Sequence, residues 1–444
     1  MSSDKQETKS VHGLIAYFLK NNHYHATLKK FEEEHGKPID PKKLPSSDET
    51  LEEIVNDRIN YNELRKQFEQ IDVHEELSVE LKELIGSQIG HWTAPYPHIG
   101  VDLVSPKISS LVLSSCHDAK TNVLFLTTND FRLIGIDLES QKVIFSLINV
   151  LNRIVIKKIL VDGDHLVLVG MDGKFYNYTY TFGNGEIQLT RVAEFQAHKR
   201  LVVDAKYIVF EGQQYIVSLG WDFFLKVFRI VGDEFEFLSE YKLATQGTSF
   251  DVVNYNDQLV VVLAKNENTL LDVLTVDNGK QLTLRYKISL NDAEFSSSSF
   301  SPRYIAIQQL GDSVPLIAVG TSHEPYMRLI VVSLKELPSL KKTEDESIQI
   351  KRNQILKNFN TLSPQDRYSQ ALISWRVADE KSIGVWVAGE DGVVRGIDLL
   401  DEKIVVELKA HSGKIKDFLS FENKDKKEVI ITSGIDKDIK QFIV

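Results

Sequence analysis

A short pattern of two strands around an aspartate turn recurs along most of the chain. Its clearest copy runs from Ser218 to Ile230, and after the turn Leu225, Val227 and Arg229 alternate with Phe224, Lys226, Phe228 and Ile230 in the period of two expected of strands. Asp222 stands at the turn, where its short carboxylate can accept hydrogen bonds from nearby backbone amides. Copies of this pattern have an apolar strand before the aspartate and apolar residues three and six positions after it, and the clear ones are at Asp130, Asp172, Asp222, Asp391 and Asp436.

The spacing of these aspartates indicates the architecture. Successive copies are separated by 42 residues (130 to 172), 50 (172 to 222), 169 (222 to 391) and 45 (391 to 436). Repeats of roughly 40 to 50 residues are typical of four-stranded propeller blades. The long interval therefore needs two more blades, and strand-like segments supply them at residues 258–264, 269–275, 304–308, 316–320 and 328–334. The sequence predicts a mainly β protein with a seven-bladed propeller.

We expect the propeller to occupy residues 91–444. Residues 335–368 are polar and weakly periodic, which favours an inserted mobile loop or a short helix. The last copy of the pattern ends with the third strand of its blade, so the fourth strand must come from upstream. Residues 108–113 are the segment that we expect to close the ring.

The first 36 residues have a different character, that of a helical hairpin. Apolar residues follow one helical face over residues 11–19 and a second face over residues 27–31, with a break between them. Gly36 is placed to end the second helix in a left-handed conformation. Because so short a hairpin cannot bury both faces alone, it needs a partner, and a second copy of itself is the simplest.

Residues 37–90 predict a helical linker or a short coiled coil. Apolar residues recur at steps of three and four from Leu51 to Leu84, with changes of phase near Asn60 and Val73. Heptads are not sustained over the length that a coiled coil requires. Helices that fold back on the hairpin or on the next domain fit equally well.

The hairpin resembles the lissencephaly-1 homology motif, LisH, through Ile15, Phe18, Leu19, Tyr24, Phe31 and Glu34. One departure is His23, which stands where the family has its turn glycine; His tolerates the left-handed conformation less easily, and Asn22 could take the strain instead. In that family the motif is a dimerisation element. The resemblance implies a homodimer held by Ile15, Phe18, Leu19, Tyr24 and Phe31.

The blades resemble WD repeats, in which a His, a Ser or Thr, the turn Asp and a Trp form a buried hydrogen-bonded set. Two copies match three of the four positions: His198 with Ser218 and Asp222, and His411 with Thr432 and Asp436. Phe228 and Phe442 stand at the Trp position. The other three copies have Leu126, Leu168 and Val387 in place of Ser or Thr. We expect those blades to depend on apolar packing.

Composition and motifs restrict the function. The formal net charge of −11 argues against nucleic-acid binding through the overall field and offers nothing to an anionic membrane. The sequence has no phosphate-binding glycine motif, no second ligand pair for zinc, and no nucleophile beside the His and Asp pairs. We expect no cofactor, no metal, no catalytic residue and no small-molecule substrate.

The expected location is the cytoplasm or the nucleus. A single cysteine, Cys116, allows no intramolecular disulfide, which fits a reducing compartment. The start of the chain lacks the apolar core of a signal peptide, and no apolar run is long enough for a membrane helix. We expect a soluble protein without membrane insertion.

The pieces predict a non-catalytic homodimeric scaffold or adaptor, whose propeller binds protein partners through the loops that converge on its two rims. Proteins with this combination regulate motors, serve as scaffold or substrate-recognition subunits of ubiquitin ligases, or belong to nuclear corepressor and splicing complexes, and the sequence does not choose among them. A propeller enzyme is the remaining alternative. Trp221 lies beside a turn, where partner contact and packing against the adjacent blade are both open.

Overall fold

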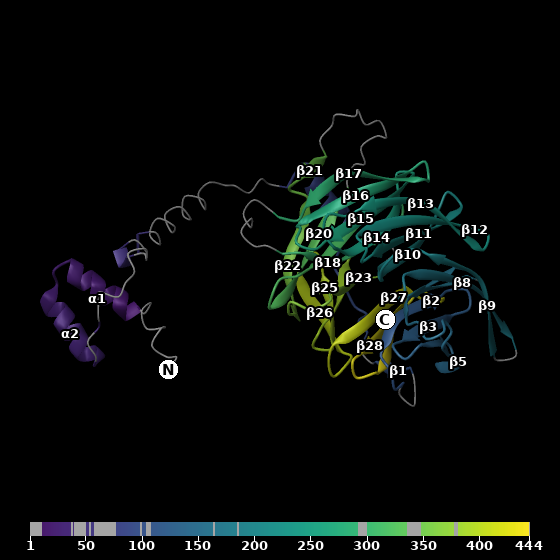
Figure 1. The fold of residues 1–444 in the computed structure, drawn as a ribbon, viewed down its shortest axis with the longest axis horizontal. Helices are drawn as coiled ribbons and strands as arrows, with labels where there is room; N and C mark the ends of the chain where they lie inside the picture. The colour runs from purple at the N-terminus through teal and green to yellow at the C-terminus, as the bar shows by residue number, and fades with distance from the viewer. Residues whose placement is uncertain are drawn as a thin grey trace. The chain divides into compact units, whose positions relative to one another are not determined.

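A computed structural model describes residues 11–36, 39, 50–52, 55–56, 77–97, 100–103, 108–162, 165–183, 186–291, 300–334, 348–376 and 381–443 (Figure 1). The chain divides into two compact units, Met1–Glu76 and Leu77–Val444. Among the described residues, no helix is both long and apolar enough to cross a membrane.

The first unit contains the helical hairpin that the two apolar faces predict. Helices α1 (Val11–Asn21) and α2 (His25–His35) are joined by a turn in which His23 adopts a φ of 61°. His23 therefore accepts the left-handed conformation for which the family uses glycine. Gly36 ends α2 with a φ of 73°, and its amide donates to the Glu32 carbonyl at 3.0 Å. Ala16 on α1 is fully buried.

The predicted linker or coiled coil, residues 37–90, falls largely outside the described residues. Its last part is helix α4 (Val79–Gln88), which belongs to the second unit. Ser78 begins this helix: its hydroxyl accepts a hydrogen bond from the Leu81 amide at 3.3 Å. Leu81, 2% exposed, packs with apolar residues of the blades. Burial of one such leucine contributes roughly 1.5–3 kcal/mol.

The described part of the second unit forms seven sheets, the blades of a propeller. Blades 1 to 3 each follow the order of the chain. Blade 1 consists of β2 (Val112–Asp118), β3 (Val123–Thr128), β4 (Arg132–Asp137) and β5 (Lys142–Ile148), and blade 2 consists of β6 (Ile156–Asp162), β7 (His165–Gly170), β8 (Lys174–Gly183) and β9 (Glu186–Gln196). Blade 3 consists of β10 (Val202–Phe210), β11 (Gln213–Gly220), β12 (Phe224–Val231) and β13 (Glu234–Lys242).

Blade 6 also follows the chain, whereas blades 4, 5 and 7 each depart from the order of the chain. Blade 4 consists of β14 (Gly247–Tyr255), β15 (Gln258–Lys265), β16 (Leu270–Asp277), β17 (Gln281–Ser289) and β21 (Gln349–Lys351). Blade 5 consists of β18 (Pro302–Gln308), β19 (Leu316–Thr321), β20 (Tyr326–Ser333) and β22 (Ile355–Pro364). Blade 6 consists of β23 (Leu372–Trp375), β24 (Gly384–Ala388), β25 (Val393–Asp398) and β26 (Lys403–Lys409). Blade 7 consists of β27 (Ile415–Glu422), β28 (Glu428–Gly434), β29 (Ile439–Ile443) and β1 (Val101–Asp102).

The core lies between the blades. Each pair of neighbouring blades shares one cluster of buried apolar side chains, so the core is a ring of interfaces. Phe228 of blade 3, for example, is fully buried and meets Phe175 of blade 2 edge to face, with ring centroids 5.3 Å apart. Phe442, 3% exposed, lies between blades 6 and 7. The two phenylalanines thus act as packing residues where the resemblance has a Trp.

The expected loop at residues 335–368 contains two strands. Residues 335–347 lie outside the described part, but β21 pairs in parallel with β17. Strand β22 pairs antiparallel with β20 and completes blade 5. The prediction of a loop or short helix is wrong for these residues, because pairing with strands distant in sequence overrides their weak periodicity.

The closing strand also differs from the prediction. The fourth strand of blade 7 is β1, whose Val101 and Asp102 lie opposite Gln441 and Lys440 of β29, so the N-terminal side of the propeller pairs with its C-terminal end (Figure 1). The segment at 108–113 does not close the ring, since Val112 and Leu113 belong to β2, the innermost strand of blade 1. Two residues of strand are too short for a period of two to identify them.

A strap formed by residues 77–97 runs over blades 5 and 6. Ile89 bridges to Ser382 in parallel, and the Ser382 amide donates to the Gln88 carbonyl at 2.8 Å. Trp92, 2% exposed, meets Trp386 edge to face at 4.6 Å. A Cβ on Gly384 would come within 2.1 Å of the Trp92 ring, so this glycine makes room for the indole. The strap is therefore part of the propeller core.

Candidate functional site

The first hydrogen-bonded set that the sequence predicts joins blades 2 and 3 at one turn. His198 lies between β9 and β10; its Nδ1 is 2.8 Å from Asp222 Oδ1, and its Nε2 is 2.8 Å from Ser218 Oγ. Asp222 Oδ2 also accepts from the Lys199 amide at 3.0 Å. Because a carboxylate can only accept, we place the imidazole proton on Nδ1, so that Nε2 accepts from the serine hydroxyl.

The second set repeats this geometry in blade 7. His411 Nδ1 is 2.9 Å from Asp436 Oδ1, and Nε2 is 2.9 Å from Thr432 Oγ1. Burial lowers the pKa of His411 and of His198, although the neighbouring aspartates act in the opposite direction. Both imidazoles are therefore neutral near pH 7, and every polar atom of the two sets has a structural partner. Ser218 and Thr432 are fully buried, so the two sets lie in the packed interior of the blades.

The other three turn aspartates have polar partners too, which corrects the expectation of apolar packing alone. Arg132 Nε donates to Asp130 at 2.9 Å. The Tyr176 hydroxyl donates to Asp172 at 2.7 Å, and Arg395 donates to Asp391 through two nitrogens at 3.1 and 2.6 Å. A side chain two or four positions later replaces the missing His and Ser or Thr.

All five turns share one backbone feature. The residue after each aspartate has a positive φ, and these residues are Phe131, Gly173, Phe223, Gly392 and Lys437. Two of the five are glycines, which adopt this conformation without a steric cost. The aspartate networks therefore hold the three other turns in a conformation that their side chains disfavour.

The LisH-like residues lie together on the hairpin. Ile15, Phe18, Leu19 and Phe31 are half-buried, and Tyr24 is 53% exposed. The Phe18 and Tyr24 ring centroids are 6.4 Å apart. Since none of these large side chains is fully buried within the hairpin, its two helices leave apolar surface for a further partner.

A cavity of about 520 Å³ lies at the mouth of the propeller's central channel. It is lined chiefly by the first residues of the innermost strands, β2, β6, β10, β14, β18, β23 and β27, so every blade contributes. Trp221, 51% exposed, also lines this mouth. The sequence placed Trp221 beside a turn but did not place it on the channel.

The channel mouth is lined by both basic and acidic side chains. Lys158 Nζ lies 3.2 Å from Asp204, and Ser115 donates a short hydrogen bond to Asp417. Asp204 keeps a lowered pKa because Lys158 and Lys206 outweigh its burial, whereas burial raises the pKa of Asp417. Each of the two carboxylates thus has a polar partner at the mouth.

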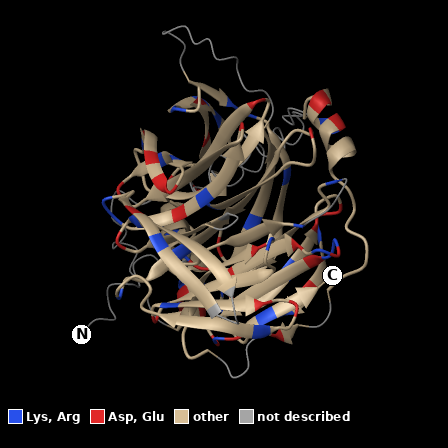
Figure 2. Cartoon of the chain, turned by 90° about the vertical axis from the view of Figure 1, so that its right-hand side faces the viewer, with Lys and Arg blue, Asp and Glu red and all other residues tan. Residues whose placement is uncertain are grey.

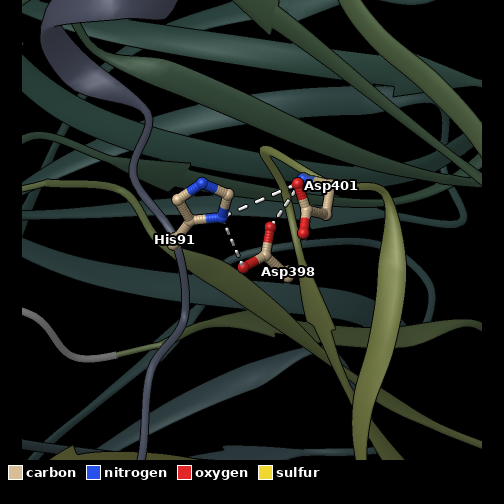
Figure 3. Close-up of side chains that lie close together, drawn as sticks. All are labelled: His91, Asp398 and Asp401. Atoms are coloured by element: carbon tan, nitrogen blue, oxygen red, sulfur yellow. Dashed lines mark hydrogen bonds and ion pairs between the residues drawn. The ribbon is translucent and has the colours of Figure 1, made fainter.

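One cluster has a combination of side chains found in metal sites, His91 with Asp398 and Asp401 (Figure 3). His91 Nδ1 lies 3.6 Å from Asp398 and 3.7 Å from Asp401. Asp398 already accepts from the Trp92 amide at 2.6 Å and from the Asp401 amide at 2.7 Å. Asp398 therefore attaches the strap to the β25–β26 turn, and this role accounts for its burial without a metal.

The comparisons with known proteins follow this division of the chain. The LisH domain of the UCP007778 family matches residues 9–40, and the β-propeller domain of the same family matches residues 71–443. An uncharacterized protein of Saccharomyces cerevisiae, YGR117C, is 25% identical over 457 residues, which cover 95% of this chain and 94% of that protein.

Among solved structures, the crystal structure of the computationally designed Ika8 protein is 12% identical, with a TM-score of 0.48 over 77% of this chain and 99% of the designed one. The two domain matches together span both units of the chain. The protein thus belongs to the UCP007778 family, which combines a LisH domain with a β-propeller.

Proposed function

We propose that the protein is a non-catalytic homodimeric scaffold that presents two propellers to protein partners in the cytoplasm or nucleus. The observation that carries the proposal is the combination, in one chain, of a hairpin with uncovered apolar side chains and a propeller with an open channel mouth. A dimer would bring two binding surfaces together and raise avidity through effective concentration.

The dimer part of the proposal depends on the apolar faces of α1 and α2. Replacing Phe18 and Phe31 by Asp places two negative charges on those faces. Burying these charges in a four-helix interface would cost more free energy than the interface supplies, so the dimer should dissociate. Light scattering should then give half of the wild-type mass. The matched control is Thr27→Asp with Lys30→Asp, because both residues are exposed on α2; this variant should keep the dimer mass.

A wild-type chain with the mass of a monomer, or a Phe18→Asp, Phe31→Asp variant with the mass of the wild type, would refute this part. Circular dichroism shows whether the hairpin of the variant still folds. Tyr24→Asp serves as a milder second variant, since Tyr24 is 53% exposed, and it should raise the dimer dissociation constant without unfolding the helices.

The identity of the partners distinguishes the kinds of scaffold. Affinity purification of the wild-type chain, followed by mass spectrometry, should recover a stable set of proteins. Ubiquitin-ligase subunits, chromatin or splicing factors, and motor subunits would each select one kind. Turnover of a small molecule by the purified protein would contradict the non-catalytic assignment.

A further inference from the structure

The innermost strands share an irregularity at the channel mouth. In six of the described ones, the pairing register shifts near the start of the strand and leaves one residue without a partner. A β-bulge of this kind turns the side chain of its extra residue and is frequent beside functional sites. The six residues all line the mouth, and they are Leu113, Lys157, Val203, Thr248, Arg303 and Lys416.

The bulges therefore place three cations and no anion around the mouth. The described residues of its lining include five basic and two acidic side chains, a formal charge of +3 in a protein whose net charge is −11. Over the propeller, Lys and Arg are otherwise interspersed with Asp and Glu (Figure 2). The mouth is a local basic site on an acidic protein, and low-dielectric walls strengthen its field.

Three of the five cations form no ion pair within the described part of the chain. Lys158 and Lys206 pair with Asp204 and Asp251 at 3.2 and 3.5 Å. In contrast, Lys157 and Lys416 form no ion pair with the described residues, and neither does Arg303.

Other polar atoms at the mouth are also without a hydrogen-bond partner among the described residues. Burial lowers the pKa of Lys157, and the charge of Lys158 adds to this effect, although Asp204 and Asp417 act against it. An anion close to Lys157 would stabilise its charged form further. The Arg303 Nε is buried and has no hydrogen-bond partner in the described part of the chain. Ser114, 3% exposed, lines the mouth with a hydroxyl that also lacks a described partner.

Exposed aromatic side chains lie beside these cations. In an antiparallel blade, the turn between the second and third strands lies at the same end as the connection to the next blade. Trp221 follows β11, in such a turn, and lines the mouth; Tyr368, 82% exposed, lies in such a connection, immediately before Ser369 of the lining. Arg303 donates to the Arg367 carbonyl at 3.2 Å, which holds this connection against the mouth.

We propose that the channel mouth binds an acidic peptide segment of a partner protein, with its carboxylates at Lys157, Arg303 and Lys416 and an apolar side chain on Trp221. The inference rests on the proposed scaffold function and assigns the site of contact. A small polyanion would use only the cations, whereas a peptide also covers the exposed Trp221 and Tyr368, as aromatic anchors in protein interfaces do.

The test uses the full-length protein and a fluorescently labelled, capped peptide of six glutamates around one leucine. Fluorescence anisotropy should show binding that weakens with salt, whereas the matching lysine peptide should not bind. Lys157→Glu with Lys416→Glu should weaken the binding at least about tenfold, because two attractive charges become repulsive. Trp221→Ala should weaken it about threefold or more.

A matched control changes charge at the other end of the blades. Lys142 and Lys403 are exposed and follow turns between third and fourth strands; Lys142→Glu with Lys403→Glu should bind as the wild type does. Thermal melting checks that each variant is folded. If the double variant in the mouth fails to fold, the single exposed change Lys416→Glu replaces it, with an expected weakening of about threefold.

Tryptophan fluorescence supplies an independent readout. The chain has four tryptophans, and Trp92, Trp375 and Trp386 are buried, so collisional quenching reports mainly on Trp221. Iodide should quench the wild type more strongly than caesium, and this preference should be lost in the Lys157→Glu, Lys416→Glu variant. The glutamate peptide should protect Trp221 from iodide.

The inference is overturned if the glutamate peptide binds no better than the lysine peptide, or if the variants in the mouth bind it unchanged. Binding of inositol hexakisphosphate without binding of the glutamate peptide would overturn it too, in favour of a small polyanion. If the peptide fails while the chain still forms a dimer and recovers a stable partner set, only this inference fails. Loss of the dimer and of any partner set would instead refute the scaffold.

Discussion

Replacing Trp92 by Ala tests whether the strap before the first blade is part of the propeller core. Trp92 is 2% exposed, lies edge to face on Trp386 at 4.6 Å, and has the Arg376 guanidinium 4.7 Å from its ring centre. Loss of a buried Trp side chain costs about 3–5 kcal/mol. The indole N–H has no hydrogen-bond partner among the described residues, and removing an unsatisfied donor returns part of this cost. We therefore expect a loss of about 3 kcal/mol.

Urea denaturation followed by far-ultraviolet circular dichroism measures this loss. The transition should move to lower urea with an unchanged slope, because the same surface is exposed on unfolding. Trp221→Ala is the matched control: it removes the same side chain from a site that is 51% exposed, and the change in free energy of unfolding should stay within about 0.5 kcal/mol. A Trp92→Ala variant as stable as the control would show that the strap is peripheral.

Three further predictions concern the blades. Because burial lowers the pKa of His198 and His411, the stability that their neutral forms supply is complete above the usual His pKa and is lost as pH falls below it; the melting temperature should fall from pH 7.5 to 5.5, and the fall should be smaller in the double His→Gln variant, so an equal fall in both would contradict the assignment. Burial raises the pKa of Cys116 to about 11, so iodoacetamide should label native protein slowly at pH 8 and urea-unfolded protein rapidly, a difference that fast native labelling would refute. Deleting residues 440–444 removes the pairing of β29 with β1 and the buried Phe442; cooperative unfolding should be lost, and a truncated protein that melts in one sharp transition would disprove closure by these strands.

Features that depend on neighbours in the chain could be predicted from the sequence. The aspartate turns, the His and Ser or Thr positions of two blades, the hairpin and the Gly36 cap all follow from spacing and local conformation. Their physical reason is short range: an aspartate at a turn bonds to amides a few residues away, and a period near 45 residues allows few architectures. Five clear copies, together with two weaker blades in the interval from 222 to 391, gave the count of seven.

Partners of the weaker turns escaped prediction, although they are also close in sequence. Arg395 and Tyr176 stand four positions after their aspartates, and Arg132 stands two positions after Asp130. Each replaces a His that the WD pattern leads one to look for elsewhere. An arginine or tyrosine on the strand that follows the turn was the available signal.

Contacts between segments that are far apart in the chain were decided only by the tertiary structure. Closure by two residues of β1, the placement of β22 in blade 5 and the burial of Trp92 against Gly384 each join parts of the chain that are far apart, and no local period encodes them. The basic channel mouth has the same origin. Lys157, Arg303 and Lys416 come from three different blades, and a bulge at each breaks the period of two that would have assigned their direction. The sequence by itself determined that the chain forms a ring of blades behind a helical hairpin; the closure of that ring decided which side chains meet at its centre.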